Sequence, residues 1–374
     1  MQKTNDFSQA RMAFQKRRRQ ENLFNLTRTL IAILISLVIV FVIVMLLSDD
    51  PLTAVATFIT GPFSTLRRMG NVVEGAIPLM FTGLAACIMF QAKQFSLIGD
   101  GAFYMGALAS TCFALYFPIT NHLTTLMALL VGGVVGAACG LIPGFLKAKW
   151  NTNEFVVSMM LNYVLVFLGQ YILINFVRDP NSGFMATYAL QDSVKLPKIL
   201  GGTKVHFGLI IAVLFTVLVY LFLYHTKQGF AIQMTGSNKG FARHIGINTF
   251  LVIFLCQVIG GFLGGVGGTV EILGMYDRFQ WTDTLGLGFD GMTVAILAAN
   301  NPALVPVGAL FLAYLRVGTE VMARTNNVPN ETVYIIQGIV MLLVTATGFL
   351  AHWRHKLVVS HAKQNENMQA KKGA

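Results

Sequence analysis

Two aspartates are the residues of this chain best placed for chemistry inside a membrane. Asp100 and Asp290 are each followed by a glycine and then by an apolar run, 102–109 in the first case and 292–299 in the second. A carboxylate at the start of a helix can accept hydrogen bonds from the unpaired backbone N–H groups there. Both runs are too short to cross a bilayer, so we predict two half-helices, of the kind that transporters place beside their pathways. Two roles stay open for each carboxylate: capping a helix and direct contact with a solute.

A second charged pair lies within an apolar segment. Arg316 and Glu320 are one helical turn apart. Isolated charges are expensive inside a bilayer, so we expect these two side chains to face each other or a polar cavity. The spacing favours an intramembrane ion pair with a structural role, and a role in the pathway or in gating is the alternative.

Enzymatic chemistry finds no support in the sequence. The chain has no set of nucleophile, base and acid, and its seven histidines show no spacing typical of metal ligands. The four cysteines all lie in apolar surroundings and are expected to be packing residues. No G-x-x-x-x-G-K-[ST] motif is present, so we predict no catalytic residue, no metal and no bound cofactor, and ATP-driven transport would need a separate ATPase subunit.

Composition identifies the class of protein. The 374 residues are 55% hydrophobic and only 11% charged, whereas soluble domains carry about 25% charge. The net charge of +11 does not indicate nucleic-acid binding, because the basic residues sit in the tails and short loops, as the positive-inside rule expects. The chain is therefore an all-α, polytopic membrane protein.

Hydropathy predicts about ten crossings. The expected spans are 29–47, 72–90, 97–117, 123–146, 155–177, 207–224, 250–273, 288–299, 303–322 and 332–350. The eighth is the weakest, because twelve residues of helix reach only about 18 Å. It must be a half-crossing, or be completed by nonhelical chain shielded by protein.

The distribution of basic residues predicts the orientation. The expected inner segments carry 18 Lys and Arg and the outer segments carry 8, a bias that places both termini in the cytoplasm. We therefore expect a basic N-terminal tail over 1–28, a membrane domain over 29–350 and a basic C-terminal tail over 351–374.

An internal repeat relates the two halves. The two Asp-Gly elements are about 190 residues apart, and Asn153-Glu154 opens the fifth span as Asn330-Glu331 opens the tenth. A shift of five spans reverses direction across the membrane, so we predict inverted 5+5 repeats whose broken elements near the third and eighth spans meet at the midplane. Independent helix starts are the alternative explanation.

Two further features concern packing and partners. Glycines spaced by four, at 260, 264 and 268 and at 261 and 265, predict close helix packing, either static or sliding. The inner segment 225–248 reads as two short amphipathic helices separated by Gly236-Ser237-Asn238. Such helices either dock in a partner's groove or rest on lipid headgroups.

Five motifs in the same order resemble the permease subunits of bacterial ATP-binding-cassette (ABC) importers for ribose-like sugars, branched-chain amino acids and nucleosides. The resemblance spans about 75–350 and is carried by 95–109, 153–163, 229–247, 288–302 and 315–318. The segment Asn153 to Tyr163 is similar to N-E-V-I-S-T-x-M-L-N-Y of the nucleoside branch. Asp100, Ser96, Ile98 and Gln233 replace the residues usual in the family; the first three lie near the expected pathway and leave the solute open.

The resemblance implies the mechanism and the site residues. A lipoprotein or periplasmic binding protein delivers a nucleoside or a ribose-like sugar, two permease subunits (identical or paralogous) form the pathway in the bacterial inner membrane, and cytoplasmic ATPases press the loop 225–248. The implied pathway residues are Phe95, Ser96, Asp100, Phe289 and Asp290, with Asn162 and Tyr163 as further candidates. The implied coupling residues lie within 231–247 and include Ala231, Gly236, Asn238, Ala242, Arg243, Gly246 and Ile247.

The main alternative is an ion-coupled secondary transporter with inverted repeats. Such a protein needs an intramembrane site for H⁺ or Na⁺, to which Asp100, Asp290 and Glu271 could contribute. The organised loop 225–248 counts against it.

Overall fold

The computed structural model describes residue 45, residues 51–117 and 122–325, and residue 338. The chain divides into two compact units, 58–321 and 1–57 with 322–374. The described part of the second unit consists mainly of the beginning of one helix and the end of another. The larger unit contains all the contacts discussed below.

The described residues are mainly helical, and the longest stretch without a helix is the connection 178–206. The α-helices are α2 (Pro51–Thr60), α3 (Leu66–Gln91), α4 (Ile98–Tyr116), α5 (His122–Trp150), α6 (Glu154–Ile172), α7 (Gly208–His225), α8 (Lys227–Ser237), α9 (Lys239–His244), α10 (Thr249–Met275), α11 (Leu287–Leu297) and α12 (Val305–Thr325). Short 3-10 turns cover Gly61–Phe63 and Pro302–Leu304, and a π-helical turn at Leu173–Val177 ends α6.

Seven helices within the described residues are long and apolar enough to cross a membrane. They are the predicted second to seventh and ninth spans, each within a few residues of the expected bounds. The first and tenth spans, both basic tails and the Asn330-Glu331 element lie outside the described residues. The helix α2 stands where only a connector was expected, and Pro51 at its first position suits a helix start because proline has no N–H to leave unpaired.

The two predicted half-helices differ in the structure. The helix α11 has 11 residues, about 16 Å, which confirms a segment too short to cross. The helix α4 runs without interruption for 19 residues and is a candidate span. The expectation of a half-helix after Asp100 is therefore wrong in length, because the apolar sequence continues to Tyr116.

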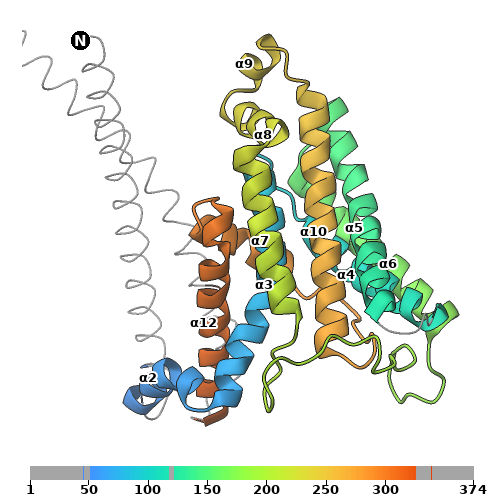
Figure 1. Ribbon diagram of the computed structural model, residues 1–374, viewed down its shortest axis with the longest axis vertical. Helices are drawn as coiled ribbons and strands as arrows, with labels where there is room; N and C mark the ends of the chain where they lie inside the picture. The colour runs from blue at the N-terminus through green and yellow to red at the C-terminus, as the bar shows by residue number, and fades with distance from the viewer. Residues whose placement is uncertain (1–44, 46–50, 118–121, 326–337, 339–374) are drawn as a thin grey trace, which may run out of the picture. The chain divides into compact units, whose positions relative to one another are not determined.

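The helix α10 lies at the centre of the larger unit, against α3, α4 and α5 (Figure 1). Its glycines let backbones meet: a Cβ on Gly268 would lie 1.9 Å from the carbonyl oxygen of Phe103 in α4, and one on Gly261 would lie 2.3 Å from that of Gly136 in α5. One glycine ridge faces α4 and the other faces α5, which confirms the close packing predicted from the spacing by four.

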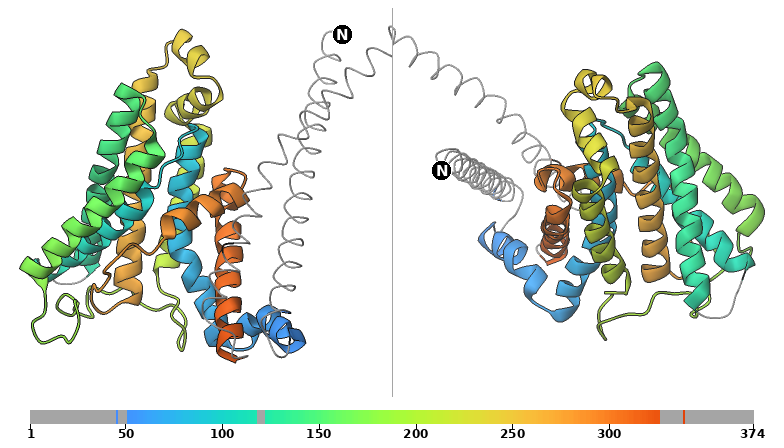
Figure 2. Two further views of the ribbon diagram at one scale, coloured as in Figure 1. Left: turned by 180° about the vertical axis from the view of Figure 1, so that it is seen from behind. Right: turned by 45° about the horizontal axis from the view of Figure 1, so that its top comes forward.

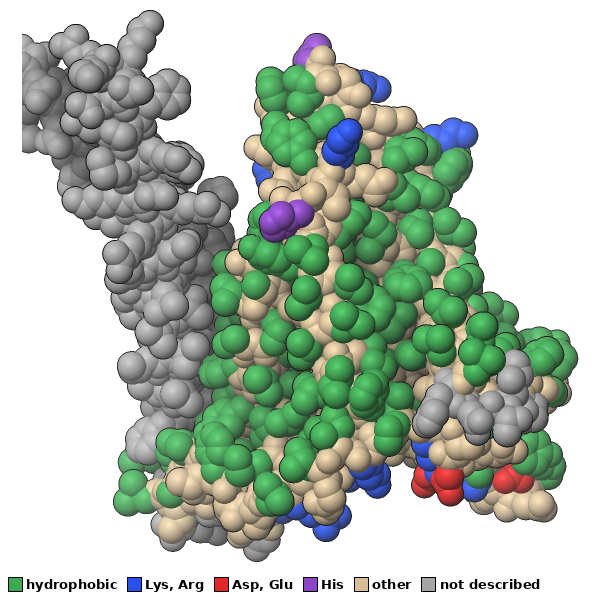
Figure 3. All heavy atoms as spheres, viewed as in Figure 1, with side chains coloured by type: hydrophobic (Ala, Val, Ile, Leu, Met, Phe, Trp, Pro, Cys, Tyr) green, Lys and Arg blue, Asp and Glu red, His purple; other side chains and the backbone are tan. Residues whose placement is uncertain are grey.

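The larger unit has two distinct ends. The short helices α8 and α9 form one end, and the connection 178–206 and the segment after α10 form the other, as both views of Figure 2 show. Between the ends, exposed apolar side chains cover the face shown in Figure 3. The exposed apolar side chains of α7 include Leu214, Val217, Leu218 and Leu221. The basic side chains gather at the ends. This is the pattern of a protein surrounded by lipid.

Candidate functional site

The two Asp-Gly elements meet in the structure. The backbone N–H of Gly288, in the first turn of α11, donates to Oδ1 of Asp100 in the first turn of α4, at 3.3 Å. The meeting point lies near the middle of α10, because a Cβ on Gly264 would lie 2.8 Å from the carbonyl oxygen of Gly99. Asp100 thus caps the other element rather than its own helix.

The first turn of α11 explains this arrangement. Gly286 precedes the helix with φ +71°, a left-handed conformation that glycine adopts without strain. Glycine has no side chain to accept the unpaired N–H groups of the helix, and Asp100 supplies one acceptor from outside. Both carboxylates are buried: Asp100 is 7% exposed and Asp290 is 4% exposed.

Polar residues at every fourth position of α6 hold the start of α4. Glu154 accepts from the N–H of Phe95 at 3.1 Å, and the hydroxyl of Ser158 accepts from the N–H of Leu97 at 2.8 Å. Asn162 accepts from the N–H of Gly101 at 3.1 Å through Oδ1 and donates to the Leu97 carbonyl through Nδ2. The carboxylate of Glu154 also pairs with Lys147 at 2.7 Å.

This stripe explains the motif 153–163 physically. A helix that starts inside a protein leaves four N–H groups without partners. The polar side chains of α6 accept from the N–H groups of Phe95 and Leu97, just before α4, and from that of Gly101 inside α4. Glu154 and Ser158 are not among the site residues predicted from the sequence. The spacing of three polar side chains at i, i+4 and i+8 in an apolar span is the signal that identifies them.

The partner of Arg316 differs from the predicted one. The sequence paired it with Glu320 in the same helix, whereas the structure places its guanidinium on Oδ2 of Asp290 in α11. This is a correction of the predicted partner: the ion pair joins two helices. Burial of both carboxylate oxygens in a short helix makes a cation from a neighbouring helix the better partner, because it neutralises the charge where water is excluded.

The remaining pathway candidates divide into buried and exposed residues. Ser96 is 2% exposed, and its hydroxyl accepts from the N–H of Ile98 at 3.4 Å. Phe95 is 55% exposed beside the ring of Phe90, and Phe289 is 47% exposed beside that of Phe155. Phe95, Asp100, Asn162, Phe289 and Asp290 therefore lie around the junction of α4, α6 and α11.

Tyr163 does not face the junction of α4, α6 and α11, whereas Asn162 does. It follows Asn162 in α6 and is 57% exposed. Since neighbouring residues of a helix point about 100° apart, only one of the two can face α4.

The segment 225–248 forms the predicted pair of short helices, although Gly236 and Ser237, which were expected in the turn, lie inside the first helix. Asn238 separates α8 from α9 and caps α9 by accepting from the N–H of Phe241 at 3.0 Å. Ala242 is fully buried and Gly246 has φ +85°, and the Ala242 carbonyl accepts from the N–H of Ile247 at 3.0 Å. The side chains of Phe230, Phe241, Arg243 and Ile245 are exposed, and Ala231 is partly buried.

This helix pair is packed directly on the membrane helices. A Cβ on Gly236 would lie 1.9 Å from the carbonyl oxygen of Gln91, the last residue of α3. The amide of Gln91 in turn donates to the carbonyl of Asn300, just after α11, at 2.8 Å. A chain of contacts thus runs from α8 through the end of α3 to the end of α11, none of which the sequence indicated.

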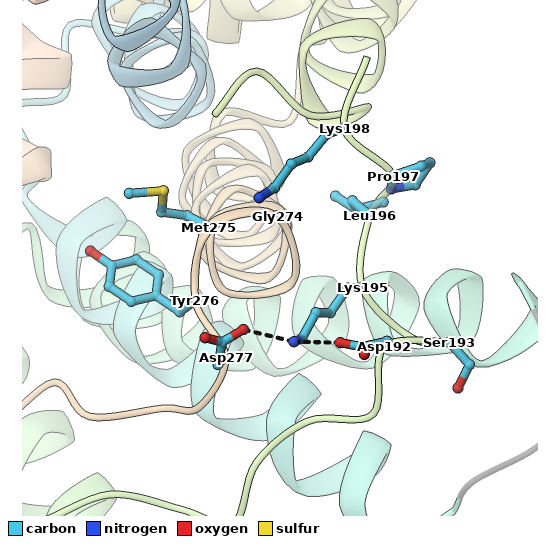
Figure 4. Close-up of a pocket in the computed structure, with 10 residues that line it drawn as sticks. All are labelled: Asp192, Ser193, Lys195, Leu196, Pro197, Lys198, Gly274, Met275, Tyr276 and Asp277. Atoms are coloured by element: carbon cyan, nitrogen blue, oxygen red, sulfur yellow. Dashed lines mark hydrogen bonds and ion pairs between the residues drawn. The ribbon is translucent and has the colours of Figure 1, made fainter. Parts of the chain in front are cut away.

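At the opposite end a polar cavity of about 530 Å³ lies between the connection 178–206 and the end of α10. Figure 4 shows the ammonium of Lys195 between the carboxylates of Asp192 and Asp277, 2.7 Å from each. These hydrogen bonds raise the pKa of Lys195, and Lys195 lowers the pKa of Asp277. Both carboxylates are largely exposed. Because Lys195 bonds to Asp277, the cluster ties the connection 178–206 to the residues that follow α10.

These features define a class of protein: a multi-pass membrane protein, with a short helix packed near the middle of its long helices and a pair of short helices at one end. Residues 68–345 match the family described as "Branched-chain amino acid transport system / permease component". The chain belongs to this family, which makes it a permease subunit embedded in the membrane rather than an enzyme.

Relatives of known name agree with this assignment. The glucose ABC transporter permease TsgB13 of Haloferax volcanii is 29% identical over 87% of this chain and 88% of its own length. The guanosine ABC transporter permease NupP of Bacillus subtilis is 26% identical over 87% and 95%. The nucleoside ABC transporter permease NupB of Lactococcus lactis is 26% identical over 86% and 92%.

Proposed function

We propose that this permease subunit forms the membrane pathway of an ATP-driven importer whose solute is a nucleoside, with a ribose-like sugar as the next class. The observation that carries the proposal is the junction of α4 and α11 at mid-depth, where Asp100 accepts the Gly288 N–H. The names of NupP and NupB support the solute class. In this proposal no cofactor binds this chain, and ATP is used by a partner.

The proposed pathway passes the junction of α4, α6 and α11. Phe95 and Phe289 present exposed rings that can contact the faces of a solute. Asp100 and Asp290 supply buried carboxylates at the same junction. Both carboxylates are buried in the present conformation, so the pathway opens only when α11 moves relative to α4. Asn162 holds the start of α4 and thereby positions Asp100.

The proposed drive comes from cytoplasmic ATPase subunits that bind α8 and α9. Exposed Phe230 and Phe241 offer apolar anchors, and Arg243 offers a charge. A push on α8 is transmitted to the end of α3, because Gly236 lies against the Gln91 backbone. The hydrogen bond from Gln91 to the Asn300 carbonyl extends this contact to the end of α11.

The other proposed partners complete the importer. A second permease subunit, identical or paralogous, lies beside this chain in the bilayer of the bacterial inner membrane. A lipoprotein or periplasmic binding protein delivers solute at the end opposite α8 and α9. Both termini lie in the cytoplasm, with basic tails over 1–28 and 351–374.

A reconstitution experiment tests the proposal. The affinity-tagged chain is purified from native membranes with its bound ATPase, placed in liposomes together with the solute-binding protein, and supplied with radiolabelled guanosine. We expect uptake with ATP and none with a non-hydrolysable analogue. Uptake by the chain alone, driven by an ion gradient without ATPase, would overturn the proposal in favour of a secondary transporter.

A further inference from the structure

A second cavity lies beside the segment that leads from α10 into α11. Its volume is about 440 Å³, within the range of small-molecule sites. One wall is the segment from Tyr276 to Leu285, and the other is Phe184 and Met185 of the connection 178–206. Gly288, the residue whose N–H is bound by Asp100, follows only three residues after this segment.

The cavity wall is aromatic and held in place. Trp281 is 6% exposed, and its ring stacks on Phe103 of α4 with centroids 5.8 Å apart. Tyr276 packs edge-on against the same indole at 5.5 Å. Phe184 on the opposite side is 55% exposed. Tyr276, backed by the buried indole, and the exposed ring of Phe184 line opposite sides of the cavity, an arrangement that can hold a flat heterocycle.

The same wall carries hydrogen-bonding groups. The Nε1 of Trp281 is buried, and the Tyr276 hydroxyl lies within its reach. Asp283 is exposed, and one of its oxygens accepts from the N–H of Thr284 at 2.7 Å, which fixes the carboxylate at the rim.

Contacts to α4 and α6 fix this segment. The hydroxyl of Tyr104 in α4 donates to the Trp281 carbonyl at 3.2 Å, and the amide of Gln170 in α6 donates to the Thr282 carbonyl. The cavity is thus built on the helices that surround Asp100. Its lining segments, the connection 178–206 and the chain after α10, lie at the end of the unit opposite α8 and α9 (Figure 1), where solute arrives in the proposed importer.

We propose that this cavity is an outer binding subsite for the solute, which it holds before passage to Asp100 and Phe289. It takes a flat heterocycle joined to a sugar that carries a vicinal diol: Phe184 and Tyr276, which Trp281 backs, contact the heterocycle, and the carboxylate of Asp283 accepts hydrogen bonds from the hydroxyls. This inference rests on the proposed function and names residues beyond it.

Uptake of two labelled nucleosides by the reconstituted complex tests the subsite. Guanosine carries the diol, and 2′,3′-dideoxyguanosine lacks it. We expect Asp283→Asn to raise KM for guanosine about tenfold, since the hydroxyls then bond to a neutral amide oxygen and lose their charged acceptor, and to leave KM for the dideoxy compound unchanged. Phe184→Ala should raise KM for both. Asp192→Asn is the matched control, an exposed carboxylate at the same end, and should change neither.

The outcomes separate the two proposals. A wild-type complex that fails to take up guanosine with ATP overturns the proposed solute and the subsite together. A wild-type complex that transports guanosine while Asp283→Asn leaves its KM unchanged overturns the subsite alone. An equal rise of KM for both nucleosides in Asp283→Asn also overturns it, because the carboxylate would then act on delivery rather than on the diol. Should Asp283→Asn not assemble, an unchanged KM in Phe184→Ala is decisive against the subsite.

Discussion

The carboxylate of Asp100 and the backbone N–H of Gly288 are separated by 188 residues in the sequence and joined by a hydrogen bond of 3.3 Å. This bond connects the first turns of α4 and α11 at the level of the middle of α10. The short helix therefore starts inside the protein with one of its first N–H groups bound by a distant side chain. Moving α11 must break this bond or carry Asp100 with it.

Removing the acceptor tests this bond. Asp100→Ala leaves the Gly288 N–H buried without a partner, so we expect a loss of about 1–3 kcal/mol in stability, seen as a lower thermal midpoint in detergent. Asp100→Asn keeps an acceptor oxygen and is the control. If both variants lose the same stability, the charge of Asp100 matters and the hydrogen bond to Gly288 does not.

The ion pair between Arg316 and Asp290 should behave as a buried pair. Arg316→Met or Asp290→Asn alone leaves one uncompensated charge, and each should cost about 3–5 kcal/mol. The double variant should cost less than the sum of the two, as a double-mutant cycle of thermal unfolding measures. Lys195→Met, which breaks exposed ion pairs to Asp192 and Asp277, should cost at most about 1 kcal/mol. Additive single effects at 290 and 316 would contradict the pairing.

Coupling should depend on the contact between α8 and α3. Gly236→Ala places a Cβ 1.9 Å from the Gln91 carbonyl oxygen, which must displace α8. Overpacking of this kind costs about 1–3 kcal/mol, so we expect ATP hydrolysis to continue in the complex while guanosine uptake falls. Gly240→Ala is the matched control, because its nearest neighbour would be at 3.4 Å. Uptake equal to wild type in Gly236→Ala would exclude this contact from coupling.

Lowering the pH should reduce the stability of the fold through His206, at the end of the connection 178–206. This side chain is fully buried, its Nδ1 accepts from the N–H of Gly208 at 3.2 Å, and burial lowers its pKa to about 4. Below its ordinary pKa of about 6.5 the unfolded chain takes up a proton that the folded chain does not. Stability should therefore be complete above pH 6.5 and fall as the pH drops to 4, by up to about 3 kcal/mol.

Thermal midpoints measured across this pH range check the prediction. His206→Gln cannot titrate, so its midpoint should fall less steeply with pH than that of the wild type. Parallel curves for the two proteins would show that His206 contributes nothing to the acid sensitivity.

Local patterns were sufficient for the helices and for the class of protein. Long apolar runs and the charge bias of the loops follow from the cost of polar groups in lipid, which each segment meets independently of its neighbours. The break between the two short helices of the segment 225–248 is equally local, since the side chain of Asn238 caps the helix that follows. The sequence also indicated that Asp100 and Asp290 belong to one region, through the repeated motif.

Tertiary structure alone decided which groups those carboxylates bind. Asp100 serves α11 rather than its own helix, and Asp290 takes Arg316 from another helix. The stripe at 154, 158 and 162, the link from Gln91 to Asn300 and the cavity at Trp281 likewise join segments that are remote in the chain. Hydrogen bonds and ion pairs depend on distances of a few ångströms, and only helix packing brings residues 26 to 209 positions apart within that reach.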